Sequence, residues 1–129
     1  MSGGHIRNWR VFLQNGIASW NIRGLQIINE KKKTQKQDLL LALLRRHRLV
    51  ALQEPHLTAA TWGGYCTWAA RNGVYTLGGP ATGFKKGTPI LSLRPFNDQD
   101  WISEYKDYFL TALHMPSGFL IVNIHLDAT

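Results

Sequence analysis

Two short apolar runs, each ending at a polar side chain, dominate the hydrophobic pattern of the sequence. Residues 17–22 form the first run, with Asn21 near its end, and residues 49–53 form the second, with Glu54 directly after it. Apolar runs bounded by turn signals are typical of strands buried on both faces, where a lone polar side chain has no packing role. The pattern therefore predicts two buried strands and marks Asn21 and Glu54 as candidates for chemistry.

The segment between the two runs changes to helical periodicity. Leu40 and Leu44 recur at the spacing of one helical face, and Thr34 stands three residues before Gln37, as in a capping box. These signals predict a helix over residues 35–47 with Thr34 as its N-cap.

The order strand, helix, strand determines how the two runs relate to each other. Strands joined through one helix lie parallel in almost all cases, so their carboxyl ends meet at one edge of the sheet. Ligands of open α/β sheets bind outside that edge, so Asn21 and Glu54 are expected to face one crevice. Taken singly, Asn21 can also be a turn residue that bonds its own backbone, and Glu54 a solvated loop carboxylate.

The second half of the chain has the turn signals and the alternation of strands. A hairpin is expected around the Asn72-Gly73 turn, and residues 94–105 form a polar connection anchored by Trp101. The expected strands are residues 65–69, 74–77, 89–93, 108–115 and 119–126. In the last of these, the period of two places Asn123 and His125 on one face. A lone strand histidine is also explained as a core side chain bonded to a backbone carbonyl.

Composition narrows the class of protein. The chain has 129 residues, which suits one domain, and a formal net charge of +7. That charge favours a polyanionic partner such as nucleic acid, although a basic protein without such a partner fits the charge equally well. The single cysteine, Cys66, excludes an internal disulfide framework and fits a reducing compartment. No stretch approaches 18 apolar residues, so we expect a soluble intracellular protein without a membrane partner.

Residues 1–10 are expected to form a flexible arm, and residues 11–129 the domain. Residues 11–13 should belong to the first strand, which an Asn-Gly turn signal interrupts at residues 14–16. Several cations are candidates for phosphate contacts, although each also suits a solvated basic loop. They are Arg23, Lys31, Lys32, Lys33, Lys85 and Lys86.

Four segments carry a resemblance to a known superfamily. They are residues 19–25 (Ser-Trp-Asn-Ile-Arg-Gly-Leu), residues 52–57 (Leu-Gln-Glu-Pro-His-Leu), residues 87–91 (Gly-Thr-Pro-Ile-Leu) and residues 122–126 (Val-Asn-Ile-His-Leu). In this order they resemble the first half of the endonuclease/exonuclease/phosphatase superfamily, whose fold is that of DNase I. The first two segments are most similar to the endonuclease domain of non-LTR retrotransposons.

The resemblance implies an α/β fold of the DNase I-like type, a four-layer sandwich in which helices flank two packed β-sheets. It implies hydrolysis of phosphodiesters with Mg²⁺ or Mn²⁺, here as DNA nicking in a retrotransposon context, in the nucleus or elsewhere in the cell. Glu54 matches the metal-binding glutamate of the family. Asn21 matches the asparagine that supports the metal and the scissile phosphate, and His125 matches a phosphate-facing histidine.

The later catalytic motifs of the family, including a Gly-Asp-x-Asn segment, are not found in these 129 residues. The resemblance therefore implies an incomplete fold, the N-terminal part of a domain, which is weakly stable and inactive alone. The missing partner would be the C-terminal half or a downstream polyprotein. Two other functions stay open: a non-catalytic or vestigial basic module that binds nucleic acid, and a phosphodiesterase or phosphatase for lipid or inositol phosphates.

Overall fold

The computed structural model describes residues 16–25, 29–82 and 87–126. In this part of the chain the protein is a mixed α/β structure with two helices and two sheets. The elements are β1 (Ile17–Asn21), α2 (Glu30–Arg46), β2 (Leu49–Gln53), α3 (Ala59–Asn72), β3 (Tyr75–Leu77), β4 (Ile90–Ser92), β5 (Trp101–Lys106), β6 (Phe109–His114) and β7 (Phe119–Ile124). The expected arm at residues 1–10, and the strand expected at residues 11–13, lie outside the described residues.

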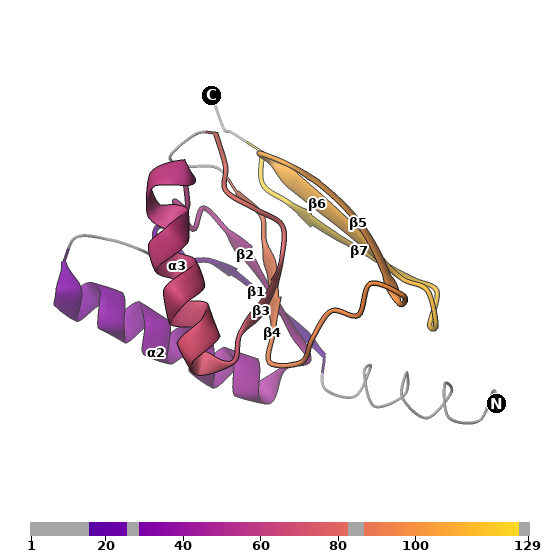
Figure 1. Ribbon diagram of the computed structural model, residues 1–129, viewed down its shortest axis with the longest axis horizontal. Helices are drawn as coiled ribbons and strands as arrows, with labels where there is room; N and C mark the ends of the chain where they lie inside the picture. Colours follow the sequence, from indigo (N-terminus) through magenta and orange to yellow (C-terminus); the bar gives the residue numbers. More distant parts are fainter. Residues whose placement is uncertain (1–15, 26–28, 83–86, 127–129) are drawn as a thin grey trace.

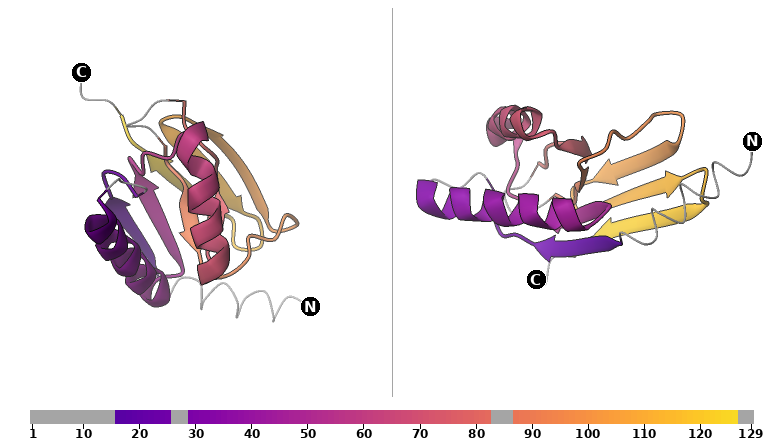
Figure 2. Two further views of the ribbon diagram at one scale, coloured as in Figure 1. Left: turned by 60° about the vertical axis from the view of Figure 1, so that its left-hand side comes forward. Right: turned by 90° about the horizontal axis from the view of Figure 1, so that it is seen from below.

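The elements form three layers. The first sheet has the strand order β1-β2-β4-β3, and the second has the order β5-β6-β7. Helices α2 and α3 cover one face of the first sheet, and the second sheet packs against its other face (Figures 1 and 2). No helix in the described segments is long and apolar enough to cross a membrane.

Strand β2 lies at the centre of both apolar cores. Val50 and Leu52 pack toward the helices, whereas Leu49 and Ala51 pack toward the second sheet. All four side chains are buried, as the uninterrupted apolar run predicts. β1 and β2 are parallel, with Asn21 opposite Gln53, so the prediction of a shared carboxyl edge is confirmed.

Strand β1 is not buried on both faces, contrary to the expectation for residues 17–22. Among the described strands it pairs only with β2, and its residues alternate between exposed and half-buried positions. Ile17, for example, is 46% exposed. The apolar content of the run misled the prediction, because a strand at a sheet edge can carry apolar residues without a second neighbour.

Helix α2 begins earlier than predicted. Its N-cap is Asn29, whose side chain accepts a hydrogen bond from the backbone amide of Lys32 (3.0 Å), so Thr34 lies inside the helix and caps nothing. A single real cap ahead of Glu30 takes precedence over a capping-box pattern further along, because only the first turn has unpaired amide groups. The Arg45 and Arg46 side chains at the last turn interact favourably with the helix dipole.

Residues 65–69 are helical rather than extended, so the predicted hairpin is wrong. They belong to α3, in which Tyr65 and Ala69 are buried one turn apart against the first sheet. The Asn72-Gly73 pair ends this helix: Gly73 has φ 67° and donates its backbone N–H to the Ala69 carbonyl. An Asn-Gly pair serves both a hairpin turn and a helix C-cap, because both need a left-handed residue.

The second sheet contains a strand that the sequence pattern missed. Residues 101–106, expected as part of a polar connection, form β5 and pair with β6. Trp101 anchors the strand as predicted, since it is 8% exposed and its ring lies 4.8 Å from that of His114. The outer face of this sheet carries exposed apolar side chains, which include Ile102, Leu120, Val122 and Ile124. The strands expected at residues 74–77, 89–93, 108–115 and 119–126 are present with shorter bounds.

Candidate active site

Asn21 and Glu54 meet at the carboxyl edge of the first sheet. The Asn21 Nδ2 donates a hydrogen bond of 2.8 Å to Glu54 Oε2. The two residues are 33 positions apart in sequence, and the parallel register of β1 and β2 brings them together. This contact is the one that the strand, helix, strand pattern predicts. It excludes the two simpler explanations, a turn asparagine bonded only to its own backbone and a glutamate surrounded only by solvent.

His125 reaches the same carboxylate from the second sheet. It follows the last residue of β7, and its Nε2 lies 3.4 Å from Glu54 Oε2, with 28% of the histidine side chain and 17% of the glutamate side chain exposed. The backbone N–H of His125 is held by the Tyr108 carbonyl at 2.9 Å. When its ring is protonated, His125 forms an ion pair with Glu54. The side chains of Asn21 and His125, from different sheets, therefore converge on the Glu54 carboxylate.

The backbone around Glu54 adopts left-handed conformations. Arg23, Glu54 and His56 have φ values of 52°, 51° and 56°. Residues other than glycine rarely adopt such values, and the strain persists only where neighbouring structure enforces it. Here the two loops hold each other, because the Gly24 N–H donates to the Glu54 carbonyl (2.7 Å) and the Leu25 N–H to the Pro55 carbonyl (2.9 Å). This pairing extends the parallel ladder beyond the strands and fixes the direction of the Glu54 side chain.

Lys36 stabilises the loop after β1, a role that the sequence pattern did not reveal. Its Nζ donates to the carbonyls of Ile22 (2.7 Å), Arg23 (2.9 Å) and Gly24 (3.0 Å). Burial lowers the pKa of this ammonium group, and the nearby charges of Lys32 and Arg23 lower it further. Three ammonium donors matched to three consecutive carbonyls define one loop conformation. The signal available in the sequence was only the position of Lys36 on the sheet-facing side of the helix.

Asn123 and Gln53 link the two sheets directly beneath the site. The Asn123 Nδ2 donates to the carbonyls of Leu52 (2.8 Å) and Pro89 (3.1 Å), and its Oδ1 accepts from Gln53 Nε2 (2.8 Å). Gln53 Nε2 also donates to Ser19 Oγ at 3.0 Å. Asn123 is 3% exposed, so this network lies in the interior. Because Asn123 stands two residues before His125 on the same face, the network sets where His125 enters the site.

The surroundings of Glu54 keep its carboxylate ionised. The hydrogen bond from Asn21 lowers the pKa of Glu54 most, burial raises it, and the charges of His125, His56 and Arg23 lower it further. The net effect is a pKa below the ordinary value for glutamate. An ionised carboxylate at neutral pH, next to an amide oxygen and an imidazole, suits the binding of a hard cation and an anionic substrate.

Removal of the Asn21 amide is expected to destabilise the protein in a pH-dependent way. A depressed folded pKa contributes stability above the unfolded glutamate pKa, about 4.3, and this contribution is lost as the pH falls through the folded pKa. Asn21→Ala should therefore lower the free energy of unfolding at pH 6, and the difference from the wild type should shrink toward pH 3. Urea unfolding at both pH values measures this. The control Asn72→Ala, on an exposed helix, should show the same difference at both, and a pH-independent Asn21→Ala effect would contradict the assignment.

The residues present fit part of a magnesium site. Mg²⁺ is typically held by one or two carboxylates together with water and substrate oxygens, and Glu54 supplies one carboxylate, whose Oε2 takes the contacts from Asn21 and His125. Asn21 uses its amide nitrogen toward Glu54, so its Oδ1 is the second available oxygen. Within residues 16–25, 29–82 and 87–126, no group of three or more His, Cys, Asp or Glu side chains converges. The site therefore supplies two oxygens rather than a complete protein cage.

The predicted phosphate-contacting cations are placed unequally. Arg23 is exposed. It lies close enough to Glu54 for its charge to lower the pKa of that carboxyl. Lys31 and Lys32 are exposed in the first turn of α2, whereas Lys33 is half-buried and pairs with Glu30 at 3.1 Å. Lys85 and Lys86 lie outside the described residues. Arg23, Lys31 and Lys32 are therefore the exposed cations among the described candidates.

The chain was compared with known proteins at the level of families and of individual sequences. No protein-family model matches it, and no curated protein matches it at a significant level. The assignment of function accordingly depends on the residues and their geometry.

Proposed function

We propose that this chain is the N-terminal part of a Mg²⁺-dependent phosphodiester hydrolase of the endonuclease/exonuclease/phosphatase type, acting on nucleic acid and nicking DNA. The observation that carries the proposal is the convergence of Asn21 and His125, from different sheets, on the carboxylate of Glu54. The same three residues stand in the segments that resemble the superfamily. Mn²⁺ would serve in the same position as Mg²⁺.

The arrangement of the sheets and helices also supports this proposal. Two sheets pack face to face, and helices cover the outer side of the first sheet, as in three of the four layers of a DNase I-like sandwich (Figure 1). The exposed apolar side chains Ile102, Leu120 and Val122 lie on the outer side of the second sheet, where the fourth layer would pack. An apolar sheet face of this kind is normally covered in a folded domain.

Each residue has a separate part in the proposed reaction. Glu54 and the Oδ1 of Asn21 would hold the cation, which supplies Lewis-acid polarisation of the phosphoryl oxygen when bound. His125, when protonated, would donate a hydrogen bond to a phosphate oxygen and stabilise charge that develops there. Arg23, Lys31 and Lys32 would contact flanking phosphates, which orient the nucleic acid without selecting its sequence.

One part of the chemistry has no counterpart in this site. Activation of the attacking water needs a general base within hydrogen-bond reach, and the Glu54 carboxylate is already engaged by Asn21 and His125. Since no third acidic or histidine ligand converges here within the described segments, we propose that the 129-residue chain binds nucleic acid but does not nick it. The alternative is a basic module that has lost catalysis altogether. Such a module would also bind DNA, but it would have no functional metal site.

One experiment with two readouts tests the proposal. Affinity for a duplex oligonucleotide, measured by fluorescence anisotropy, should fall steeply with salt because phosphate contacts release counterions. The triple variant Arg23→Gln, Lys31→Gln, Lys32→Gln should reduce the slope of log affinity against log salt by about 2 to 3, at roughly 0.9 for each phosphate contact. The second readout is plasmid nicking with Mg²⁺, which should be absent.

The control for the binding readout is Arg71→Gln, which removes an exposed arginine from the last turn of α3. Its effect on the salt slope should be less than half that of the triple variant. A flat salt dependence, or equal slopes for the triple variant and the wild type, would remove the support for nucleic acid as the substrate. Robust nicking that Glu54→Ala abolishes would show that the chain is active alone and overturn the claim of inactivity.

A further inference from the structure

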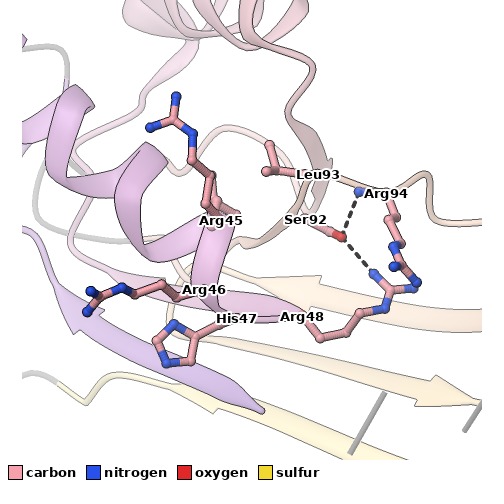
Figure 3. Close-up of a pocket in the computed structure, with 8 residues that line it drawn as sticks. Arg45, Arg46, His47, Arg48, Ser92, Leu93 and Arg94 are labelled. Atoms are coloured by element: carbon pink, nitrogen blue, oxygen red, sulfur yellow. Dashed lines mark hydrogen bonds between the residues drawn. The ribbon is translucent and has the colours of Figure 1, made fainter. Parts of the chain in front are cut away.

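A second basic site lies at the opposite edge of the first sheet. A pocket of about 190 Å³ opens where α2 ends and where β4 ends, and four of its lining residues are the arginines Arg45, Arg46, Arg48 and Arg94. Figure 3 shows the Arg48 guanidinium directed toward Ser92 and the Arg94 side chain extending toward that guanidinium, whereas Arg45 and Arg46 extend away from Ser92. The pocket is thus built around two guanidinium groups, with two further positive charges near its rim.

The strand register explains why these residues meet. β2 and β4 are antiparallel, with Val50 opposite Leu91 and Ala51 opposite Ile90. Arg48, just before β2, and Arg94, just after β4, therefore stand at the same end of the sheet. Glu54 follows the other end of β2, six positions after Arg48, which corresponds to roughly 20 Å of extended chain at about 3.3 Å per residue. One phosphate group cannot contact both sites.

Ser92 holds the Arg48 side chain and the Arg94 backbone in place. It is buried, and its Oγ accepts a hydrogen bond from Arg48 Nη1 (2.8 Å) and another from the backbone N–H of Arg94 (3.0 Å). The Arg48 backbone is fixed as well, because its N–H donates to the Gly16 carbonyl at 3.0 Å. The Arg48 guanidinium is therefore pre-positioned rather than free to turn into solvent, and less rotamer entropy is lost when a ligand binds.

The charge distribution favours an anion in this pocket. Burial lowers the pKa of Arg48, and the neighbouring charge of Arg94 lowers it further. The Arg94 guanidinium itself makes no hydrogen bond to any residue of the described segments. Two adjacent guanidinium groups repel each other, and an oxyanion between them removes that repulsion while accepting hydrogen bonds from both.

We propose that this pocket binds a phosphate group, with Arg48 and Arg94 as a paired guanidinium clamp and with Arg45 and Arg46 supplying further positive charge. Phosphate is favoured over a carboxylate because its tetrahedral oxygens can take forked hydrogen bonds from two arginines at once, and because it can carry two charges. The volume holds a phosphate group together with several waters of about 30 Å³ each. The group can belong to a nucleic acid backbone that passes this edge, or to a small phosphate ligand.

The test compares Arg94→Gln with the wild type, using inorganic phosphate as the probe. Titration by calorimetry or by amide shifts in NMR should show saturable binding to the wild type, against a background of chloride at equal ionic strength. Arg94→Gln should weaken this binding by about tenfold or more, since it removes a charged pair of hydrogen bonds. Arg94→Lys keeps the charge but lacks the fork, and should give an intermediate affinity. Arg71→Gln, the matched control, should bind as the wild type does.

Stability without phosphate separates a binding role from a structural one. Arg94 is exposed, and its removal relieves repulsion on Arg48, so Arg94→Gln should unfold at the same urea concentration as the wild type or a higher one. A duplex oligonucleotide then identifies the source of the phosphate. Weaker DNA binding by Arg94→Gln assigns the pocket to the nucleic acid backbone, and unchanged DNA binding with lost phosphate binding assigns it to a small phosphate ligand.

Two results would overturn the proposal. One is phosphate binding that is equal in the wild type and Arg94→Gln. The other is clear destabilisation of Arg94→Gln in the absence of phosphate, which would make the arginine structural. Because Glu54→Gln leaves this pocket untouched and should keep its phosphate binding, failure here is distinguishable from failure of the proposed metal site.

Discussion

Replacement of Asn123 with leucine should lower the free energy of unfolding by about 3 kcal/mol, because a buried polar network is broken and the larger apolar side chain must fit into a packed interior. The Leu52 carbonyl would lose its hydrogen bond in the interior and the half-buried Gln53 amide would keep only its bond to Ser19, while the Pro89 carbonyl would keep its bond from the Leu52 N–H. Each buried group left without a partner costs about 1 to 3 kcal/mol. Urea unfolding followed by far-UV circular dichroism measures the change.

The matched control is Asn72→Leu, which makes the same substitution at an exposed position whose side chain bonds only within its own helix. Its effect should stay within about 0.5 kcal/mol, as is usual for surface changes. A loss of less than about 1 kcal/mol for Asn123→Leu would show that the network contributes little to the packing of the two sheets. In that case the position of His125 would have to be set by its backbone hydrogen bond to Tyr108 instead.

Replacement of Glu54 with glutamine should weaken the binding of Mg²⁺ and Mn²⁺ by about thirtyfold or more, since Glu54 supplies the only carboxylate in the site that the structure describes. The substitution keeps the shape of the side chain and an oxygen that can still accept from Asn21. The fold should therefore survive, with a small change in the urea midpoint. Isothermal titration calorimetry of the two proteins at pH 7 measures the loss of affinity.

The control for this change is Glu104→Gln, which removes an exposed carboxylate from β5 and should leave the affinity unchanged. Equal affinities for the wild type and Glu54→Gln would exclude Glu54 as a ligand. Loss of the folded state in Glu54→Gln would instead assign the carboxylate a structural role. The lowered pKa of Glu54 is compatible with such a role, because structural contacts also shift pKa values.

The elements that the sequence predicts well are those in which one signal dominates. β2 is apolar at four consecutive positions and is buried on both faces, and its parallel pairing with β1 follows from the helix between them. The signals failed where one residue pattern serves two structures. Asn72-Gly73 ends a helix here and would equally close a hairpin, and the aromatic residues of α3 have strand propensity that tertiary packing overrides.

The candidate site likewise contains residues whose positions could be predicted from the sequence and residues whose positions could not. That Asn21 and Glu54 lie together could be predicted, because both follow parallel strands at one edge. His125 could not be placed there by periodicity, which gave only its face on the strand; its expected role came from the resemblance. Lys36 and Asn123 were beyond prediction, because their contacts join segments distant in sequence and depend on the packing of the two sheets. The pairing of Arg48 with Arg94 likewise depends on a register that the sequence does not state.

The central claim is that Glu54 and Asn21 hold a divalent cation beside His125, and NMR with Mn²⁺ tests it most directly. Trace Mn²⁺ added to the ¹⁵N-labelled 129-residue chain should broaden the amide signals of residues within reach of the ion, first those of Gly24, Glu54 and His125. Excess Mg²⁺ should restore these signals, and Glu54→Gln should abolish the broadening. Uniform broadening, or broadening centred elsewhere and unchanged in Glu54→Gln, would contradict the claim.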